Sequence, residues 1–147
     1  MENHKVDKLL EIKDVIKTED SRNNYLRGLM RIAESDKKMI SAEEEYIYKI
    51  AEIIGASHSE IWQAEQQQEN DRHAVIHFAT DQEKSLFLMQ ALYVCWLDDD
   101  FSDAEHEEII KIGNELGVDQ AKLEDTEAWV KQGIEWMRGG AELIGLE

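Results

Sequence analysis

The chain has 147 residues, of which 33 are Asp or Glu and 16 are Lys or Arg, giving a formal net charge of −17. This length suits one domain with its own apolar core, expected over residues 1–147. The charge disfavours nucleic acid and membrane surfaces, whose binding needs clustered Lys and Arg. It favours basic protein surfaces and divalent cations as partners. The competing explanation is that the negative charge only keeps the protein soluble.

The absence of proline and the low number of glycines, eight, predict an all-α fold. The only cysteine, Cys95, lies in an apolar run, which excludes an intrachain disulfide and predicts a core position. No stretch approaches the roughly 20 apolar residues of a membrane helix. Charges interrupt the apolar residues near the N-terminus, where a signal peptide would have a continuous apolar segment. We therefore expect a cytoplasmic protein that does not bind a membrane.

The first half of the chain is expected to contain four helices, over residues 6–16, 23–35, 41–55 and 59–68. Residues 18–24 are predicted to be a polar break. Ser41 and Glu44 suit the start of the third helix, because the serine hydroxyl can accept from a first-turn amide and the glutamate can reach back. Gly55 suits its end, because glycine readily adopts the left-handed conformation found there.

The second half is expected to contain four helices, over residues 82–97, 102–117, 120–124 and 127–143. The first is apolar nearly all round, which is typical of an enclosed helix, and Thr80 with Glu83 offers it a capping box. The last has one apolar face, made of Trp129, Val130, Gly133, Trp136 and Met137. We expect this face to close the core. Alternatively its tryptophans cover a second copy, so the chain is expected to be a monomer or a homodimer.

An internal repeat relates the two halves. Shifting the sequence by 62 positions aligns Asp36 with Asp98, Ala42 with Ala104, Glu43 with Glu105 and Gly55 with Gly117. Each unit then consists of an apolar helix, an acidic loop, an amphipathic helix and a glycine stop. We expect a compact bundle of about seven to eight helices with two pseudo-symmetric helical hairpins. The units would cover residues 23–69 and 82–125, followed by the C-terminal helix over 127–143.

The acidic elbow over residues 98–105 resembles the signature of the TerB-like family, in which an aspartate, commonly with glycine next, is followed by an apolar residue, a serine and a glutamate. Neither elbow of this chain has that glycine. Residues 36–44 echo it in the first unit. The resemblance covers roughly residues 23–143. The family includes the tellurite-resistance protein TerB and the N-terminal domain of a membrane-anchored J-domain co-chaperone. The resemblance implies a non-catalytic bundle with pseudo-twofold symmetry, whose two acidic elbows bind divalent metal.

Seven carboxylates are candidate ligands for Ca²⁺ or Mg²⁺, because both cations prefer oxygen ligands. They are Asp98, Asp99, Asp100 and Glu105 in the second elbow, and Asp36, Glu43 and Glu44 in the first. The second elbow is the better candidate, because Lys37 and Lys38 bring positive charge into the first. The preferred interpretation is that these acidic residues only stabilise helix starts through the helix dipole, by about 0.3–1 kcal/mol each.

His73 and His77 are four residues apart and would share a helix face as zinc ligands. No third ligand is indicated, so ordinary partly buried histidines are the preferred interpretation. His106, between glutamates, is expected on the surface.

The leading functional hypothesis is a non-catalytic TerB-like module for protein–protein interaction or stress response, with a divalent cation at an elbow. Its partner would be a protein with a basic surface. One alternative is a hydrolase in which carboxylates hold a metal ion and water is the nucleophile. Another alternative is an acidic decoy that mimics nucleic acid. The net charge is the only observation that supports this hypothesis.

Overall fold

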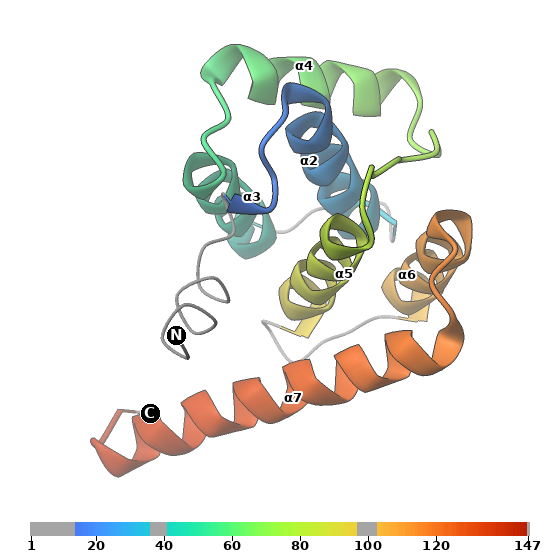
Figure 1. The fold of residues 1–147 in the computed structure, drawn as a ribbon. Helices are drawn as coiled ribbons and strands as arrows, with labels where there is room; N and C mark the ends of the chain where they lie inside the picture. The colour runs from blue at the N-terminus through green and yellow to red at the C-terminus, as the bar shows by residue number, and fades with distance from the viewer. Residues whose placement is uncertain (1–13, 36–40, 97–102, 147) are drawn as a thin grey trace, which may run out of the picture.

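The computed structural model describes residues 14–35, 41–96 and 103–146, which form α-helices and contain no strand (Figure 1). The helices within these ranges are α2 (Glu19–Ala33), α3 (Ser41–Ile53), α4 (His58–Asn70), α5 (Asp81–Trp96), α6 (Asp103–Leu116) and α7 (Gln120–Leu143). The predicted all-α fold is confirmed. The helix predicted over residues 6–16 falls mostly outside the described residues.

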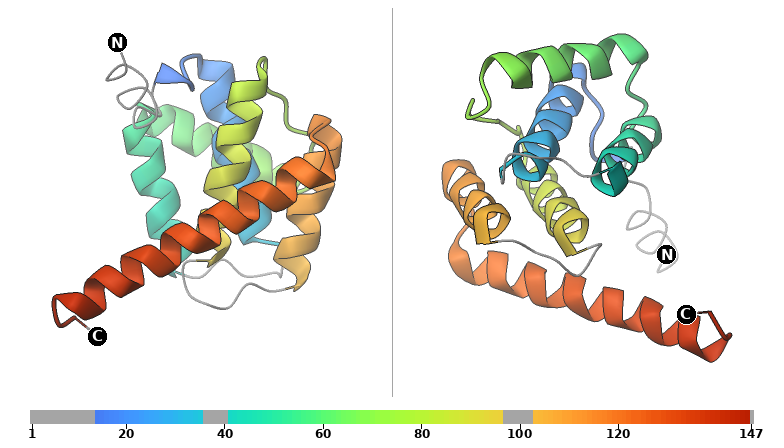
Figure 2. Two further views of the ribbon diagram at one scale, coloured as in Figure 1. Left: turned by 60° about the horizontal axis from the view of Figure 1, so that its bottom comes forward. Right: turned by 180° about the vertical axis from the view of Figure 1, so that it is seen from behind.

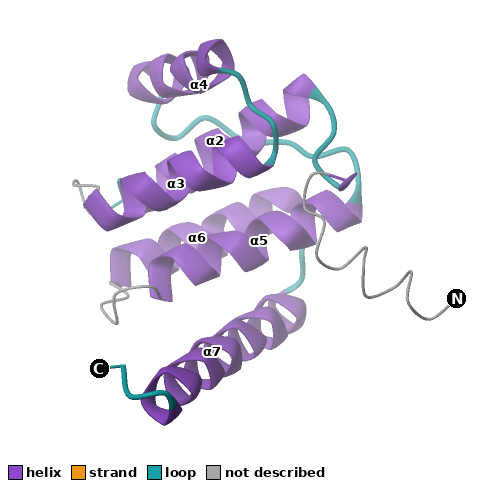
Figure 3. Ribbon diagram, turned by 90° about the vertical axis from the view of Figure 1, so that its left-hand side faces the viewer, coloured by secondary structure: helices purple, strands orange, loops and turns teal. Residues whose placement is uncertain are grey.

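The helices are stacked in four layers (Figure 3). Helices α2 and α3 form one inner layer, and α5 and α6 form the other. Helix α4 covers α2 from outside, and α7 covers α5 and α6 from the opposite side. The apolar core lies where α2 and α5 meet, because these two helices contact both layers around them.

The helices of the two halves begin at a constant separation. Helices α2 and α5 begin at residues 19 and 81, α3 and α6 at 41 and 103, and α4 and α7 at 58 and 120, so each pair is 62 residues apart. Both α3 and α6 are followed by a glycine of positive φ, Gly55 at 81° and Gly117 at 78°. The two predicted glycine stops are confirmed.

Threonine side chains cap the two central helices. The Thr80 hydroxyl accepts from the Glu83 amide at 3.1 Å, and the Glu83 carboxylate accepts from the Thr80 amide at 3.0 Å, which confirms the predicted capping box. Thr18 caps α2 by accepting from the Ser21 amide at 3.0 Å. The predicted polar break over residues 18–24 is therefore wrong, because polar residues there form a helix start that lies partly inside the protein.

The last two predicted helices are one continuous helix, α7. The polar residues 124–127 suggested a break, yet they include neither glycine nor proline. Within the helix, the Thr126 hydroxyl donates to the Lys122 carbonyl at 2.8 Å. Leu123 and Val130, two turns apart and on either side of the expected break, are both buried. Anchoring of both turns on the bundle keeps the helix uninterrupted.

The expectation that the α7 tryptophans close the core is wrong. Trp129 is 60% exposed and Trp136 is 81% exposed, whereas Leu123 and Val130 are buried and Ile134 packs on the core. The packed face of α7 is thus turned away from the tryptophan face. Helix α7 also extends beyond the bundle with its C-terminal half (Figures 1 and 2).

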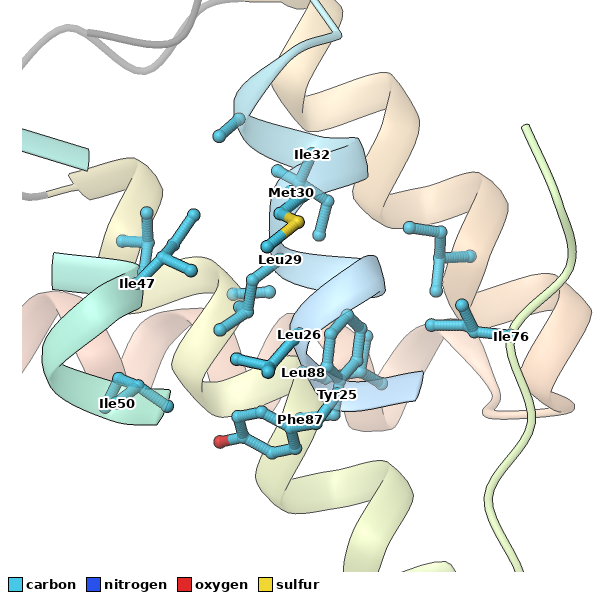
Figure 4. Packing of buried hydrophobic residues seen from close by; sticks show 14 of the residues in the cluster. Tyr25, Leu26, Leu29, Met30, Ile32, Ile47, Ile50, Ile76, Phe87 and Leu88 are labelled. Atoms are coloured by element: carbon cyan, nitrogen blue, oxygen red, sulfur yellow. The ribbon is translucent and has the colours of Figure 1, made fainter. Parts of the chain in front are cut away.

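Large apolar side chains from α2 and α5 fill the centre of the core (Figure 4). The Tyr25 ring lies edge-on to Phe87, with ring centroids 5.7 Å apart. Cys95 is buried in the same cluster, which confirms its predicted core position.

Replacing Tyr25 with phenylalanine is expected to preserve or raise stability at neutral pH, by up to about 1 kcal/mol, because the buried Tyr25 hydroxyl has no hydrogen-bond partner among the described residues. Burial raises the pKa of Tyr25 well above its usual value of 10. A raised folded-state pKa gives stability that is complete below pH 10 and is lost as the pH rises further. Tyr25→Phe should therefore lose less stability above pH 10, as measured by urea unfolding at pH 7 and 10.5.

Tyr46→Phe is the matched control for this change. The Tyr46 hydroxyl donates to the Gln90 side chain at 3.0 Å. Removing this hydroxyl should therefore lower the free energy of unfolding by about 0.5–1.5 kcal/mol at pH 7. Equal losses at pH 7 in the two variants would contradict the distinction between a satisfied and an unsatisfied hydroxyl.

Candidate functional site

The predicted metal ligands are only partly within the described residues. Asp36, Asp98, Asp99 and Asp100 lie outside them. Glu43 and Glu105 are the third residues of α3 and α6, and both are buried. Neither of these two carboxylates is without a partner. Glu44 is exposed.

No cluster of three His, Cys, Asp or Glu side chains suited to a metal occurs within residues 14–35, 41–96 and 103–146. The second elbow has three of its four candidate ligands outside those ranges, so metal binding there stays a prediction. Glu43 and Glu105 lie in the first turns of α3 and α6, where the helix dipole favours a carboxylate without a bound metal.

The histidines do not form a zinc site within the described part of the chain. His73 and His77 lie in the connection between α4 and α5, which is not helical, so their four-residue spacing does not place them on one helix face. Both are exposed, and the expectation of partly buried histidines is wrong for them. His106 is half-buried, with its ring nitrogen 3.4 Å from a Glu127 oxygen.

A groove with a volume of about 360 Å³ lies among α2, α3 and α4. Buried Met30 and Ile47 form its apolar part. Its polar lining includes four glutamates and one arginine, namely Glu34, Glu44, Glu65, Glu69 and Arg72. Glu44 is the only one of these five residues that the sequence predicts as a site residue. The groove lies between the end of α2, the middle of α3 and the end of α4. These segments are far apart in the sequence, so no local sequence pattern predicts the groove.

The charges in the groove influence one another. Burial raises the pKa of Glu34, Arg72 opposes this rise, and Glu69 adds to it. The Tyr48 hydroxyl donates to Glu65 at 2.5 Å, and this hydrogen bond raises the pKa of Tyr48 to about 12. Tyr48 therefore keeps its proton at neutral pH and holds the Glu65 carboxylate in place.

This arrangement suits a lysine or arginine side chain. Such a side chain buries an aliphatic stem along apolar surface while its charged end stays among polar groups. Here the stem would lie along Met30 and Ile47, and the charged end would meet the surrounding carboxylates. Hydrogen bonds between ionised groups are about twice as strong as neutral ones, so they would determine the preference for a cation.

None of the described helices combines the length and the apolar content that crossing a bilayer needs. The chain matches no protein-family profile, no curated protein and no solved structure. Its resemblance to the TerB-like family stays a prediction.

Proposed function

We propose that the protein is a non-catalytic, TerB-like interaction module that binds a lysine- or arginine-bearing segment of a partner protein in the groove among α2, α3 and α4. The observation that carries this proposal is the combination of an apolar base with four glutamates around it. The net charge of −17 would speed the encounter with a basic partner, because such fields steer oppositely charged molecules.

The constant 62-residue separation of helix starts supports the proposal of two pseudo-symmetric units. Counted with this offset, Glu34 corresponds to Trp96. Glu69 corresponds to Lys131, whose ammonium nitrogen lies 4.7 Å from the centroid of the Trp96 ring. The second half of the chain thus has an aromatic side chain and a lysine at these positions. The first half has glutamates there instead. Among the described residues, the groove contains one cation of the chain itself, Arg72, against four glutamates, and this excess of negative charge suits a cation supplied by another molecule.

The test is peptide binding to the full chain. The probe is a fluorescent 12-residue peptide containing lysine and arginine, with fluorescence anisotropy measured at low and physiological salt. Combining Glu34→Gln with Glu69→Gln should raise the dissociation constant at least about 10-fold, because a hydrogen bond to a charged group contributes about 1.5–3 kcal/mol. Glu34→Trp, which copies the residue of the second unit, should abolish binding by filling the groove.

The matched control combines Glu107→Gln with Glu124→Gln, two exposed positions on α6 and α7. It changes net charge by the same amount and should alter the dissociation constant less than about twofold, as expected for distant surface charges. An equal loss in the two double variants would mean that overall charge, rather than the groove, attracts the peptide, and would reject the proposal.

A further inference from the structure

Helix α7 carries a largely exposed apolar stripe beside its packed face. At about 100° per residue, five of its positions fall on one line along the helix. They alternate between large and small residues: Trp129, Gly133, Trp136, Gly140 and Leu143. We call this set the α7 stripe. By the same spacing, no charged residue between 129 and 144 falls on it.

The stripe has no covering element among the described residues. Its two tryptophans are 60% and 81% exposed, and Leu143 is 89% exposed. A Cβ atom added at Gly133 or Gly140 would meet nothing within 4 Å. The glycines therefore leave open notches, Gly133 between the two tryptophans and Gly140 between Trp136 and Leu143. An exposed apolar patch of this kind marks an interaction surface.

We propose that the α7 stripe binds the α7 stripe of a second copy of this chain, with the two helices antiparallel across a twofold axis. When the axis passes between Ile134 and Glu135, Trp129 of one copy lies opposite Gly140 of the other, and Gly133 lies opposite Trp136. Each tryptophan then meets a glycine notch. A twofold interface requires such self-complementarity, and this stripe supplies it. Knobs of one helix fit into holes of the other.

The area is sufficient for a specific dimer. A tryptophan buries about 150–250 Å², so the two in the stripe offer on the order of 300 Å² at their observed exposures. Met137, Leu143, Ile144 and Leu146 are also exposed, and they add a similar area. Two copies would together bury on the order of 1,200 Å², the lower limit for stable specific interfaces. An interface at this lower limit should form a weak dimer whose fraction rises with protein concentration.

Sedimentation equilibrium of the full chain tests the proposal. Between micromolar and several hundred micromolar protein, the mass should rise from 17.1 kDa towards twice that value. Trp136→Glu should raise the dissociation constant at least about 30-fold, as expected for a central aromatic anchor. Its fold should be unchanged by circular dichroism, because the side chain is exposed. A chain that stays monomeric throughout, as it would if its own N-terminal residues covered the stripe, would reject the proposal.

Gly140→Leu is the more specific variant. It adds apolar surface, which would strengthen non-specific association, yet it fills the notch that receives Trp129 of the other copy. The proposal predicts weaker dimerisation. Trp62→Glu is the matched control, because Trp62 is also 60% exposed but lies on α4. It should leave the mass unchanged, and loss of the dimer in this variant would place the interface elsewhere.

Spin labels test the antiparallel direction. Glu135 and Glu124 are both exposed and fall on one side of α7, and the only thiol, Cys95, is buried. Each variant carries one label per copy, so the distance is measured between the same residue in the two copies. In the proposed register, these two labels are offset along the helix axis by about 2 Å at position 135 and by about 32 Å at position 124. The measured distance between labels should thus be clearly longer at 124. Equal distances at the two positions would indicate parallel helices and overturn the register.

Discussion

Replacing Arg31 with methionine is expected to lower the free energy of unfolding by about 2–4 kcal/mol, because the buried guanidinium loses charge-assisted hydrogen bonds to two partly exposed glutamates. The Arg31 side chain is buried and joins α2 to α6. It donates to Glu108, and to both carboxylate oxygens of Glu115 at 3.0 and 3.2 Å. It also donates to the Ala74 carbonyl at 3.3 Å. Burial alone would lower the pKa of Arg31, but these carboxylates raise it.

The measurement is the thermal unfolding midpoint at pH 7, which should fall by roughly 6–12 °C for a chain of this size. The control combines Arg31→Met with Glu108→Gln and Glu115→Gln, which removes both negative partners together with the cation. Replacing a buried cation together with its carboxylate partners is often neutral, so part of the lost stability should return. If Arg31→Met and the triple variant were equally unstable, lost side-chain packing rather than uncompensated charge would be the cause.

The features that could be predicted from the sequence are those that local chemistry determines. Thr80 with Glu83 fixes a helix start within four residues, and Gly55 and Gly117 mark helix ends through their positive φ. The position of Cys95 in the core also follows from its apolar neighbours. In each case the residues that decide the structure are adjacent in the chain.

The features that could not be predicted depend on contacts between distant segments. Which face of α7 is buried is decided by α5 and α6, and the more aromatic face, with Trp129 and Trp136, is left exposed. The groove requires α2, α3 and α4 to be in their final positions. Arg31 belongs to the same class, because its glutamate partners lie on α6.

Replacing Gly28 with alanine is expected to destabilise the protein by about 2–3 kcal/mol, although alanine is the better helix former by about 1 kcal/mol. A Cβ atom at Gly28 would lie 2.5 Å from two ring carbons of Phe87 and 2.8 Å from the Ile76 Cδ1 atom. Phe87 and Ile76 are buried, so neither has room to move freely. The close approach of α2 to α5 therefore depends on the missing side chain at position 28. Denaturant unfolding would measure the change.

Two further variants make this prediction specific. Gly139→Ala is the matched control, because that glycine is also helical and a Cβ atom there would meet nothing within 4 Å. It should be neutral or stabilising by up to about 1 kcal/mol. Combining Gly28→Ala with Phe87→Leu removes the ring atoms that the new methyl group would meet. The pair should then be less destabilising than the sum of the single changes, because the two side chains share one space. Strict additivity would show that the cost at position 28 does not come from Phe87.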